Sequence, residues 1–497
     1  MPDWDRLIAW WHSLRCQTSE QILGRLRYET AWLAYPRFPT LVRAGCEEAA
    51  RRCRPQSNFR WSGEPARNGP PSAGASLLAR FQANYFDWPI QAGEIESWIA
   101  ANPPGAWPSW HPYPTSLRIV NWIRAAPLTP VAAKSLAAQA AFLDNNLEFH
   151  LGGNHLLENA GALLAAGLFF EGPDAARWRS RGLDLLCREV RAQVLSDGGH
   201  RERSPYYHLR MTRLVEGITA LLAARGALVP PELEQAARDM SAFHQALRHL
   251  DGSLPLFHDS LEPAEPLPPA RGPLSFPASG YYVLDIPEGR LIADYGAPGD
   301  SPNPGHHHAG IFSFEISTPA GKVIVDSGTP TYDPGPRRDR LRSTAAHNTV
   351  RVDARDQFQV WGGFRVGRRA SVSEVVEQRE GSCHSITAAH DGYRRLGVEH
   401  RRLIVALPGT GWLILDDLTG RGSHLVESFL HLAPGFESLG WKVVPFGFPG
   451  PPRRIDDTYS PAPAVEEPAQ TLVLGGHVDL PCRFGYLVAP PEMRYNR

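Results

Sequence analysis

One stretch of the chain, residues 304–352, concentrates side chains that bind metals or move protons. Three consecutive histidines, His306 to His308, follow a Pro-Gly turn, and Asp326 closes the apolar run Val-Ile-Val. A further histidine, His347, precedes a segment that is typical of a strand. If the backbone is already extended at residue 306, His306 and His308 point to the same side. Ligand-type side chains at strand ends can converge on one divalent ion, so the stretch predicts a metal site.

A second candidate lies where a predicted helix begins. Asn154 and His155 follow two glycines and precede a helical stripe of leucines and alanines. A helix start presents backbone N–H groups and the positive end of the helix dipole, which suits a carboxylate. Asparagine is also a preferred N-cap residue, and for Asn154 taken alone the N-cap is the better interpretation.

A pair of tyrosines forms the third candidate. Tyr206 and Tyr207 follow a glycine turn and precede His208 in the stretch 196–211, which also contains arginines. A tyrosine side chain has a pKa of about 10, so it acts as an acid or base near neutral pH only where a cation or metal stabilises the phenolate. The alternative is an aromatic plug at the N-terminus of a helix, without a chemical role.

Other common chemistries find no support in the sequence. It contains no GxSxG elbow, Walker loop or dinucleotide fingerprint, which argues against a nucleophilic triad and Gly-rich phosphate binding. The formal net charge of −1 gives no global field to recruit an anionic polymer, and the six cysteines are scattered. No apolar run of about 18 residues is present. Without a clear signal peptide, the default expectation is a cytoplasmic protein, with periplasmic or secreted location as the alternative.

The elements that position these side chains change type along the chain. Residues 1–260 have helical periodicity, which predicts antiparallel helical hairpins in a bundle, solenoid or toroid. Residues 261–279 form a Pro-rich linker. Residues 280–497 alternate short Val-, Ile- and Tyr-rich runs with Gly, Pro and Asp, which predicts an antiparallel β-sandwich that carries the metal site.

Taken together, the motifs resemble the heparinase II/III-like polysaccharide lyase superfamily. They are Asn154-His155 at a helix start, ERSPYYH at 202–208, the His306/His308 pair before a strand containing Phe-Glu, and DSGT at 326–329 followed by RSTAAHNT at 342–349. The likeness extends over residues 117–369 in motif terms. It implies an incomplete α/α toroid followed by an antiparallel β-sandwich.

The resemblance implies β-elimination at a uronic acid, which leaves a 4,5-unsaturated sugar. This reaction needs a neutralised C6 carboxylate, a base for the C5 proton and an acid for the leaving oxygen. By position, Asn154 with His155 nearby faces the carboxylate, Tyr207 is the acid and a candidate base, and His306 is the alternative base. Tyr206 competes with Tyr207 for its role. Because these residues come from both halves of the chain, we expect the active site at the domain junction.

The same resemblance assigns His308, Asp326 and His347 to a divalent metal, with zinc preferred over manganese. The metal is expected to order a loop of the β domain. Tyr332 is implied to help bind substrate from the same loop. Arg342 either binds a carboxylate or sulfate or holds Asp326, and the two interpretations carry equal weight.

The expected function is cleavage of uronic-acid-containing polysaccharides, with glycosaminoglycans such as heparan sulfate, hyaluronan or chondroitin preferred and alginate or a bacterial exopolysaccharide as the alternative. Two other classes stay open, namely a non-catalytic polysaccharide-binding or assembly protein and a metal-dependent hydrolase. The expected partner is an acidic polysaccharide or oligosaccharide, with no nucleic acid and no membrane insertion. One departure from the family is Gly310, where an acidic residue is common, and this puts the hydrogen bonding of the histidine pair in question.

Overall fold

The computed structural model describes residues 3–491 apart from 34–37, 57–58, 60, 62–69, 71–75, 264–266, 269, 271–273, 300 and 303. The chain divides into two compact units, and each is described by itself. The helical unit comprises residues 17–194 and 209–240, and the sheet unit comprises residues 1–16, 195–208 and 241–497. These units do not coincide with the predicted boundaries at 260 and 280. Part of the predicted linker 261–279 lies outside the described residues.

Three segments that were predicted in the α domain belong to the sheet unit, namely residues 1–16, 195–208 and 241–260. Side-chain contacts explain the last two. Phe243 packs in one buried cluster with Phe276 and Tyr281. The Asp197 carboxylate accepts hydrogen bonds from the backbone N–H and the hydroxyl of Ser279, at 2.7 and 2.8 Å. Helical periodicity reports the local conformation of such segments, whereas their domain is decided by these long-range contacts.

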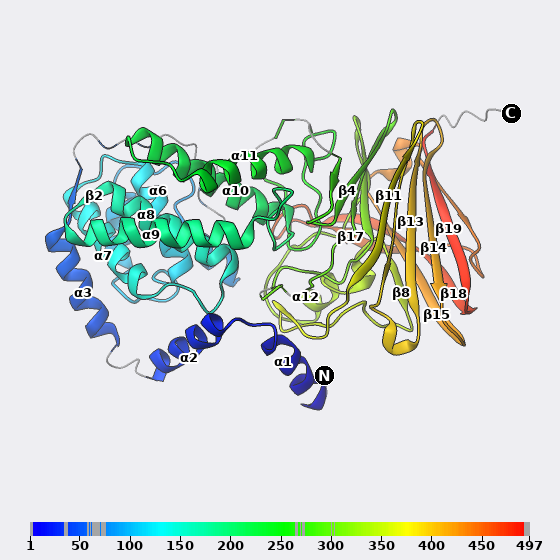
Figure 1. The fold of residues 1–497 in the computed structure, drawn as a ribbon, viewed down its shortest axis with the longest axis horizontal. Coiled ribbons are helices and arrows are strands. Elements are labelled where there is room, and N and C mark those ends of the chain that lie inside the picture. Colours follow the sequence, from blue (N-terminus) through cyan, green and yellow to red (C-terminus); the bar gives the residue numbers. More distant parts are fainter. Residues whose placement is uncertain are drawn as a thin grey trace. The chain divides into compact units, whose positions relative to one another are not determined.

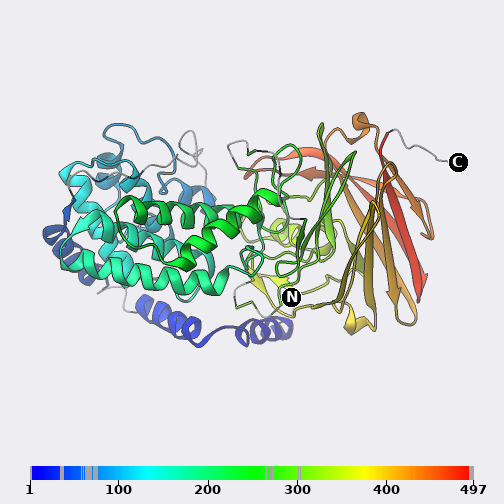
Figure 2. The ribbon, with the colours of Figure 1, turned by 45° about the horizontal axis from the view of Figure 1, so that its top comes forward.

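The helical unit consists of helices joined mostly by short loops (Figures 1 and 2). Its helices are α2 (Ser19–Leu33), α3 (Phe38–Arg52), α4 (Leu77–Gln82), α5 (Glu94–Ala101), α6 (Pro112–Arg124), α7 (Pro130–Asn145), α8 (Gly153–Phe169) and α9 (Pro173–Gln193), with most of α10 (Pro205–Ala224) and α11 (Pro231–Ala246). A short pair, β1 (Arg54–Pro55) and β2 (Phe170–Glu171), lies in the same unit.

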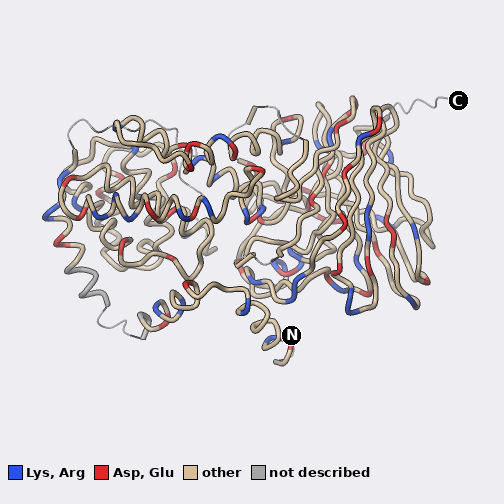
Figure 3. Tube along the Cα trace, in the orientation of Figure 1, with Lys and Arg blue, Asp and Glu red and all other residues tan. Residues whose placement is uncertain are grey.

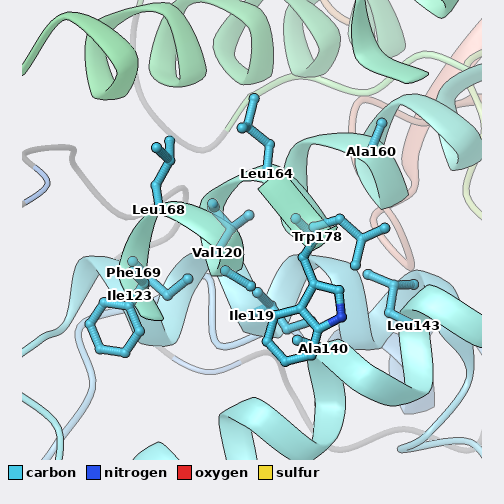
Figure 4. Packing of buried hydrophobic residues seen from close by; sticks show 14 of the residues in the cluster. Ile119, Val120, Ile123, Ala140, Leu143, Ala160, Leu164, Leu168, Phe169 and Trp178 are labelled. Atoms are coloured by element: carbon cyan, nitrogen blue, oxygen red, sulfur yellow. The ribbon is translucent and has the colours of Figure 1, made fainter. Parts of the chain in front are cut away.

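Helix α8 is the centre of this unit because its sequence is apolar on nearly every side. It is rich in alanine and leucine, and the side chains of α6, α7 and α9 pack against it (Figure 4). Two glycines allow α8 and α9 to approach closely. A Cβ at Gly167 would lie 2.3 Å from the backbone nitrogen of Arg179, and one at Gly182 would lie 2.5 Å from that of Leu164. Any larger residue at these positions would push the helices apart.

The sheet unit contains two antiparallel sheets. The nine-stranded sheet is formed by β3 (Ser275–Phe276), β4 (Tyr281–Ile286), β5 (Gly289–Asp294), β6 (Ser313–Thr318), β7 (Gly321–Ile324), β8 (Val350–Val352), β15 (Ser423–Leu432), β17 (Arg453–Tyr459) and β18 (Glu467–Asp479). The six-stranded sheet is formed by β11 (Val372–Glu380), β12 (Cys383–His390), β13 (Glu399–Leu407), β14 (Gly411–Thr419), β16 (Lys442–Phe446) and β19 (Cys482–Ala489).

The two sheets share one core and form a sandwich. Leu284 and Ile316 from one sheet and Ile404 and Ile414 from the other lie in a single buried cluster. The indole N–H of Trp412 on β14 donates to the carbonyl oxygen of Leu284 on β4, at 2.9 Å. Figure 1 shows β13, β14 and β19 side by side, as the strand order requires.

Short elements decorate the sheet unit. They are α1 (Asp3–Leu14), the hairpin of β9 (Val360–Trp361) with β10 (Arg365–Val366), and α12 (Pro336–Leu341). Both Lys and Arg and Asp and Glu are distributed over each unit, in keeping with the net charge of −1 (Figure 3). Among the helices of the described part of the chain, none has both the length and the apolar content needed to cross a membrane.

The predicted fold class, a helical region followed by antiparallel sheets, is confirmed. Closure of the helices into an incomplete toroid stays a prediction. Strands β4 to β19 lie within residues 280–497, where the antiparallel sandwich was predicted.

Candidate active site

Tyr207 lies in the first turn of α10, at a helix start that is tied to the sheet unit. The Ser204 hydroxyl accepts a hydrogen bond from the backbone N–H of Tyr207, at 3.2 Å, and donates to the carbonyl oxygen of Asp259, at 2.7 Å. Ser204 thus satisfies a backbone donor at the helix start, as an N-cap residue does, and fixes Tyr207 relative to Asp259. The neighbouring Tyr206 is half-buried and meets Tyr207 edge to face.

The ring of Tyr207 stacks on the ring of His306, with centroids 3.9 Å apart and planes 25° from parallel. His306 Nδ1 lies 2.9 Å from Oδ2 of Asp259, and its Nε2 lies 3.8 Å from Oε2 of Glu202. Because Asp259 can only accept when ionised, this contact places a proton on Nδ1 and leaves Nε2 of neutral His306 as a proton acceptor. Two of the predicted catalytic residues are therefore in direct contact.

Asp259 is a buried carboxylate with four donors. Besides His306, it accepts from His308 Nε2 at 2.8 Å and from both terminal nitrogens of Arg338 at 2.5 and 2.7 Å. Asp259 and Arg338 are both fully buried. Burial acts to raise the pKa of Asp259, but Arg338 and the two histidines hold that pKa well below its ordinary value. The carboxylate therefore stays ionised and orients His306.

Two further side chains border this group. Tyr332 is half-buried with a buried hydroxyl oxygen, and burial together with the charge of Asp259 raises its pKa well above the ordinary value. The hydroxyl of Tyr207 lies near enough to Tyr332 and Arg338 to influence the pKa of each. The ring of Phe364 lies 6.1 Å from the ring of His306, and 40% of Phe364 is exposed.

The three predicted metal ligands are only partly brought together. His347 Nδ1 lies 2.7 Å from Oδ2 of Asp326, and the rings of His308 and His347 are 5.3 Å apart. His308 Nδ1 and His347 Nε2 are buried without a hydrogen-bond partner. Each nitrogen has a lone pair that could bind a cation. Asp326, however, serves as a partner of His347. Within the described residues no three His, Cys, Asp or Glu side chains are arranged to hold a metal.

The structure gives Arg342 other partners than the two that were predicted. It is fully buried, and its guanidinium donates to the carbonyl oxygens of Gly305, His307, Gly363 and Arg365. The side chain is thus engaged by backbone acceptors, and it contacts neither solvent nor Asp326. Arg342 fixes the backbone of the histidine stretch.

His307 and Gly310 are both packed against other histidines. His307 is buried against His258, with centroids 5.0 Å apart, and burial lowers its pKa well below the ordinary value. Gly310 lies against His347, because a Cβ there would be 2.9 Å from Cγ of that ring. An acidic side chain at position 310 would not fit, and the His306/His308 pair is instead held by Asp259.

Asn154 and His155 belong to a separate polar cluster in the helical unit. Helix α8 has Gly152 as its N-cap, so the N-cap interpretation of Asn154 is wrong. Asn154 Nδ2 donates to the hydroxyl of Tyr113 at 3.3 Å, and His155 Nδ1 lies 3.0 Å from Oε1 of Glu148. Burial acts to raise the pKa of Glu148, but His155 and other partners lower it to about 2. Glu148 thus presents an anion that orients His155.

Asp259, Glu148 and Arg338 hold candidate site residues in place, but they were not among the predicted site residues. Asp259 lies at the end of the predicted α domain, just before the Pro-rich linker, and Glu148 lies in the predicted helical region without a motif. Arg338 has no local signal, since its partner Asp259 is 79 positions away. The local signal near Asp259 is the polar His-Asp-Ser tripeptide at 258–260.

Comparisons with known proteins agree with the fold. The heparinase II/III N-terminus family matches residues 126–266, and the heparinase II/III-like C-terminal family matches residues 268–460. A crystal structure of heparinase III superposes with a TM-score of 0.66 at 17% identity, covering 84% of this chain and 76% of that one. At this identity the superposition shows a shared fold.

Two curated relatives differ in whether their names specify a reaction. A heparin-sulfate lyase of Bacteroides stercoris is 36% identical over 112 residues, which is 22% of this chain and 17% of the relative. FtsZ-localized protein C of Caulobacter vibrioides is 29% identical over 326 residues, which is 59% of this chain and 54% of the relative. The matched part of the chain therefore spans about half or less of the length of these relatives. From the two matched families and the shared fold, the chain belongs to the heparinase II/III-like superfamily.

Proposed function

We propose that the protein is a polysaccharide lyase that cleaves acidic, uronate-containing polysaccharides by β-elimination. Glycosaminoglycans such as heparan sulfate, hyaluronan or chondroitin are the preferred substrates, and alginate or a bacterial exopolysaccharide is the alternative. The observation that carries the proposal is Tyr207 stacked on His306, whose Nδ1 is held by the buried, ionised Asp259. The heparin-sulfate lyase relative supports the substrate class.

In the proposed reaction, Nε2 of His306 removes the C5 proton of the uronate, and the electron pair of that bond forms the C4–C5 double bond. The C4–O bond breaks, and the Tyr207 hydroxyl protonates the leaving oxygen. Asp259 and Glu202 both face the resulting imidazolium of His306 and stabilise its charge. Proton transfer through solvent from His306 back to Tyr207 restores the enzyme. Asn154 and His155 remain the predicted partners of the substrate carboxylate.

The test is a screen of heparan sulfate, chondroitin sulfate, hyaluronan and alginate, read by the ultraviolet absorbance of the unsaturated uronate and by product mass. We expect Tyr207→Phe to reduce the rate by about 10²–10⁴-fold, the usual contribution of a general acid or base. Tyr206→Phe is the matched control and should retain most of the activity. Absence of unsaturated product across the panel, or equal losses for both variants, would contradict the proposal.

A second candidate function is non-catalytic polysaccharide binding. The match to FtsZ-localized protein C, whose name specifies no reaction, favours keeping it. Tight binding of a uronate polymer to the wild-type protein, with no unsaturated product and no new reducing ends, would support this function over lyase activity.

A metal, zinc in preference to manganese, is a separate proposal that rests on the unpartnered Nδ1 of His308 and Nε2 of His347. Asp326 would act here by orienting His347. No step of the reaction above depends on the metal. Elemental analysis of the purified protein tests the proposal, with His347→Gln expected to lose the metal. Wild-type protein without bound metal after purification with added zinc would contradict it.

A further inference from the structure

The tip of the β9–β10 hairpin holds an aromatic ring beside the catalytic pair, and the proposed reaction gives it no role. Phe364 is 40% exposed, although it lies among fully or partly buried polar groups. Its ring is 6.1 Å from the ring of His306 and 5.5 Å from that of Tyr332, with the guanidinium of Arg338 at 5.2 Å. The ring therefore combines an exposed face with a position beside the groups that are proposed to act on the substrate, where a bound ligand would contact it.

The backbone beneath this ring is held rigidly. Gly362 and Gly363 both have positive φ, 58° and 76°, as the tight turn before Phe364 requires. The carbonyl oxygen of Gly363 accepts from Nε of Arg338 at 3.1 Å and from Nη1 of Arg342 at 2.9 Å. Both arginines are fully buried. Two buried cations therefore fix the position of a residue whose own side chain faces solvent.

Helix α1 fixes the base of the same hairpin. The Ser13 hydroxyl donates to the carbonyl oxygen of Val366 at 2.8 Å, and the rings of Trp10 and Trp361 are 6.1 Å apart. The guanidinium of Arg365 lies 4.6 Å from the ring of Trp10. The hairpin is thus held on both strands, and the ring of Phe364 is presented in a defined place.

We propose that Phe364 is a stacking platform for the pyranose ring next to the bond that is cleaved. This inference rests on the proposed function, because it needs a sugar at Tyr207 and His306. A pyranose has one face of C–H groups that suits a phenyl ring, and polar edges that suit the surrounding arginine, tyrosine and histidine groups. Phe364 touches substrate and takes no proton, so its contribution is to binding.

The first experiment compares kinetics of Phe364→Ala, Phe364→Leu and Phe364→Trp on heparan sulfate. Alanine and leucine should raise KM at least about fivefold, with kcat changed less than about threefold and its pH profile unchanged, while tryptophan should restore KM. Leucine keeps an apolar side chain over Arg338 without an aromatic face. Phe446→Ala is the matched control, since Phe446 is 41% exposed on β16 of the same unit. An unchanged KM, a loss confined to kcat, or an equal effect of Phe446→Ala overturns the inference.

The second experiment measures binding of heparan sulfate oligosaccharides by calorimetry in the Tyr207→Phe background. Phe364→Ala should weaken this affinity by the same factor as it raises KM. If wild-type protein binds but forms no unsaturated product, the proposed lyase function fails, and the affinity change alone decides the role of Phe364. Affinity that is unaffected by Phe364→Ala, or no binding of any uronate polymer, overturns the inference.

Discussion

Replacement of Asp259 by asparagine tests the centre of the site. The carboxylate of Asp259 accepts from four donors, namely Nδ1 of His306, Nε2 of His308 and two nitrogens of Arg338. An asparagine of the same shape offers one acceptor oxygen, and its amide nitrogen would face donors. The buried charge of Arg338 would lose its counterion, and His306 could turn to its other tautomer or orientation.

The expected magnitudes follow from this burial. Removing one partner of a buried ion pair costs about 3–5 kcal/mol, so Asp259→Asn should lower the free energy of unfolding by several kcal/mol. Loss of the carboxylate that orients a catalytic histidine costs about 10⁴-fold in kcat in an unrelated triad enzyme, and we expect a loss of about 10³–10⁴-fold here. Urea unfolding followed by circular dichroism and initial rates on the best polymer measure the two effects.

A double variant separates stability from chemistry. Asp259→Leu with Arg338→Met removes both buried charges, and it should recover much of the lost stability because no ion is left unpaired. It should recover none of the activity, because His306 still lacks its anchor. Recovery of activity in the double variant, or full activity of Asp259→Asn, would refute the assignment of Asp259 as the residue that positions His306.

Three further predictions concern stability. The buried Asp416 pairs with Arg402, which outweighs desolvation and lowers its pKa from 3.8 to about 2. The stabilisation is complete above pH 3.8 and is lost as the pH falls toward about 2. In urea unfolding at a series of pH values, the free energy of unfolding of the wild type should therefore fall by about 2 kcal/mol more over this range than that of Asp416→Asn. Gly182→Ala gains about 1 kcal/mol of helix propensity, but its Cβ would press on the backbone of Leu164 at a cost of about 1–3 kcal/mol. The variant should therefore unfold at a lower temperature than the wild type. Gly310→Ala should lower the Tm by a few degrees, because its Cβ meets the ring of His347; an unchanged Tm would show that the ring can move away.

The parts of the fold that could be predicted from sequence are those with a strong local pattern. Helix α8 is marked by its alanine and leucine run after two glycines, and β4 to β7 alternate with clear turn residues. The ring contact between Tyr207 and His306 joins two stretches that were selected for their residue types. Sequence motifs thus identified the members of the contact, and the fold supplied its geometry.

The missed features depend on pairing over long distances. Residues 195–208 look helical or turn-like, yet Asp197 and Ser204 bind partners far along the chain and place this segment in the sheet unit. Because arginine binds anions, its residue type makes Arg342 a candidate partner of a substrate carboxylate or sulfate, or of Asp326. Its actual acceptors are backbone carbonyls, which carry no signature in a sequence. The backbone carbonyls that accept from a buried guanidinium cannot be predicted from periodicity or from a motif.

One polar network connects the features that the proposed chemistry needs. Asp259 contacts His306 on one side and His308 on the other, while Arg338 joins Asp259 to the carbonyl of Gly363 beneath Phe364. Such a network is stable only when every member is satisfied, because a buried ion without a partner costs several kcal/mol. The position of the proton acceptor and that of the aromatic ring therefore depend on the same buried ion pair. Loss of either ion is therefore expected to displace both the proton acceptor and the aromatic ring.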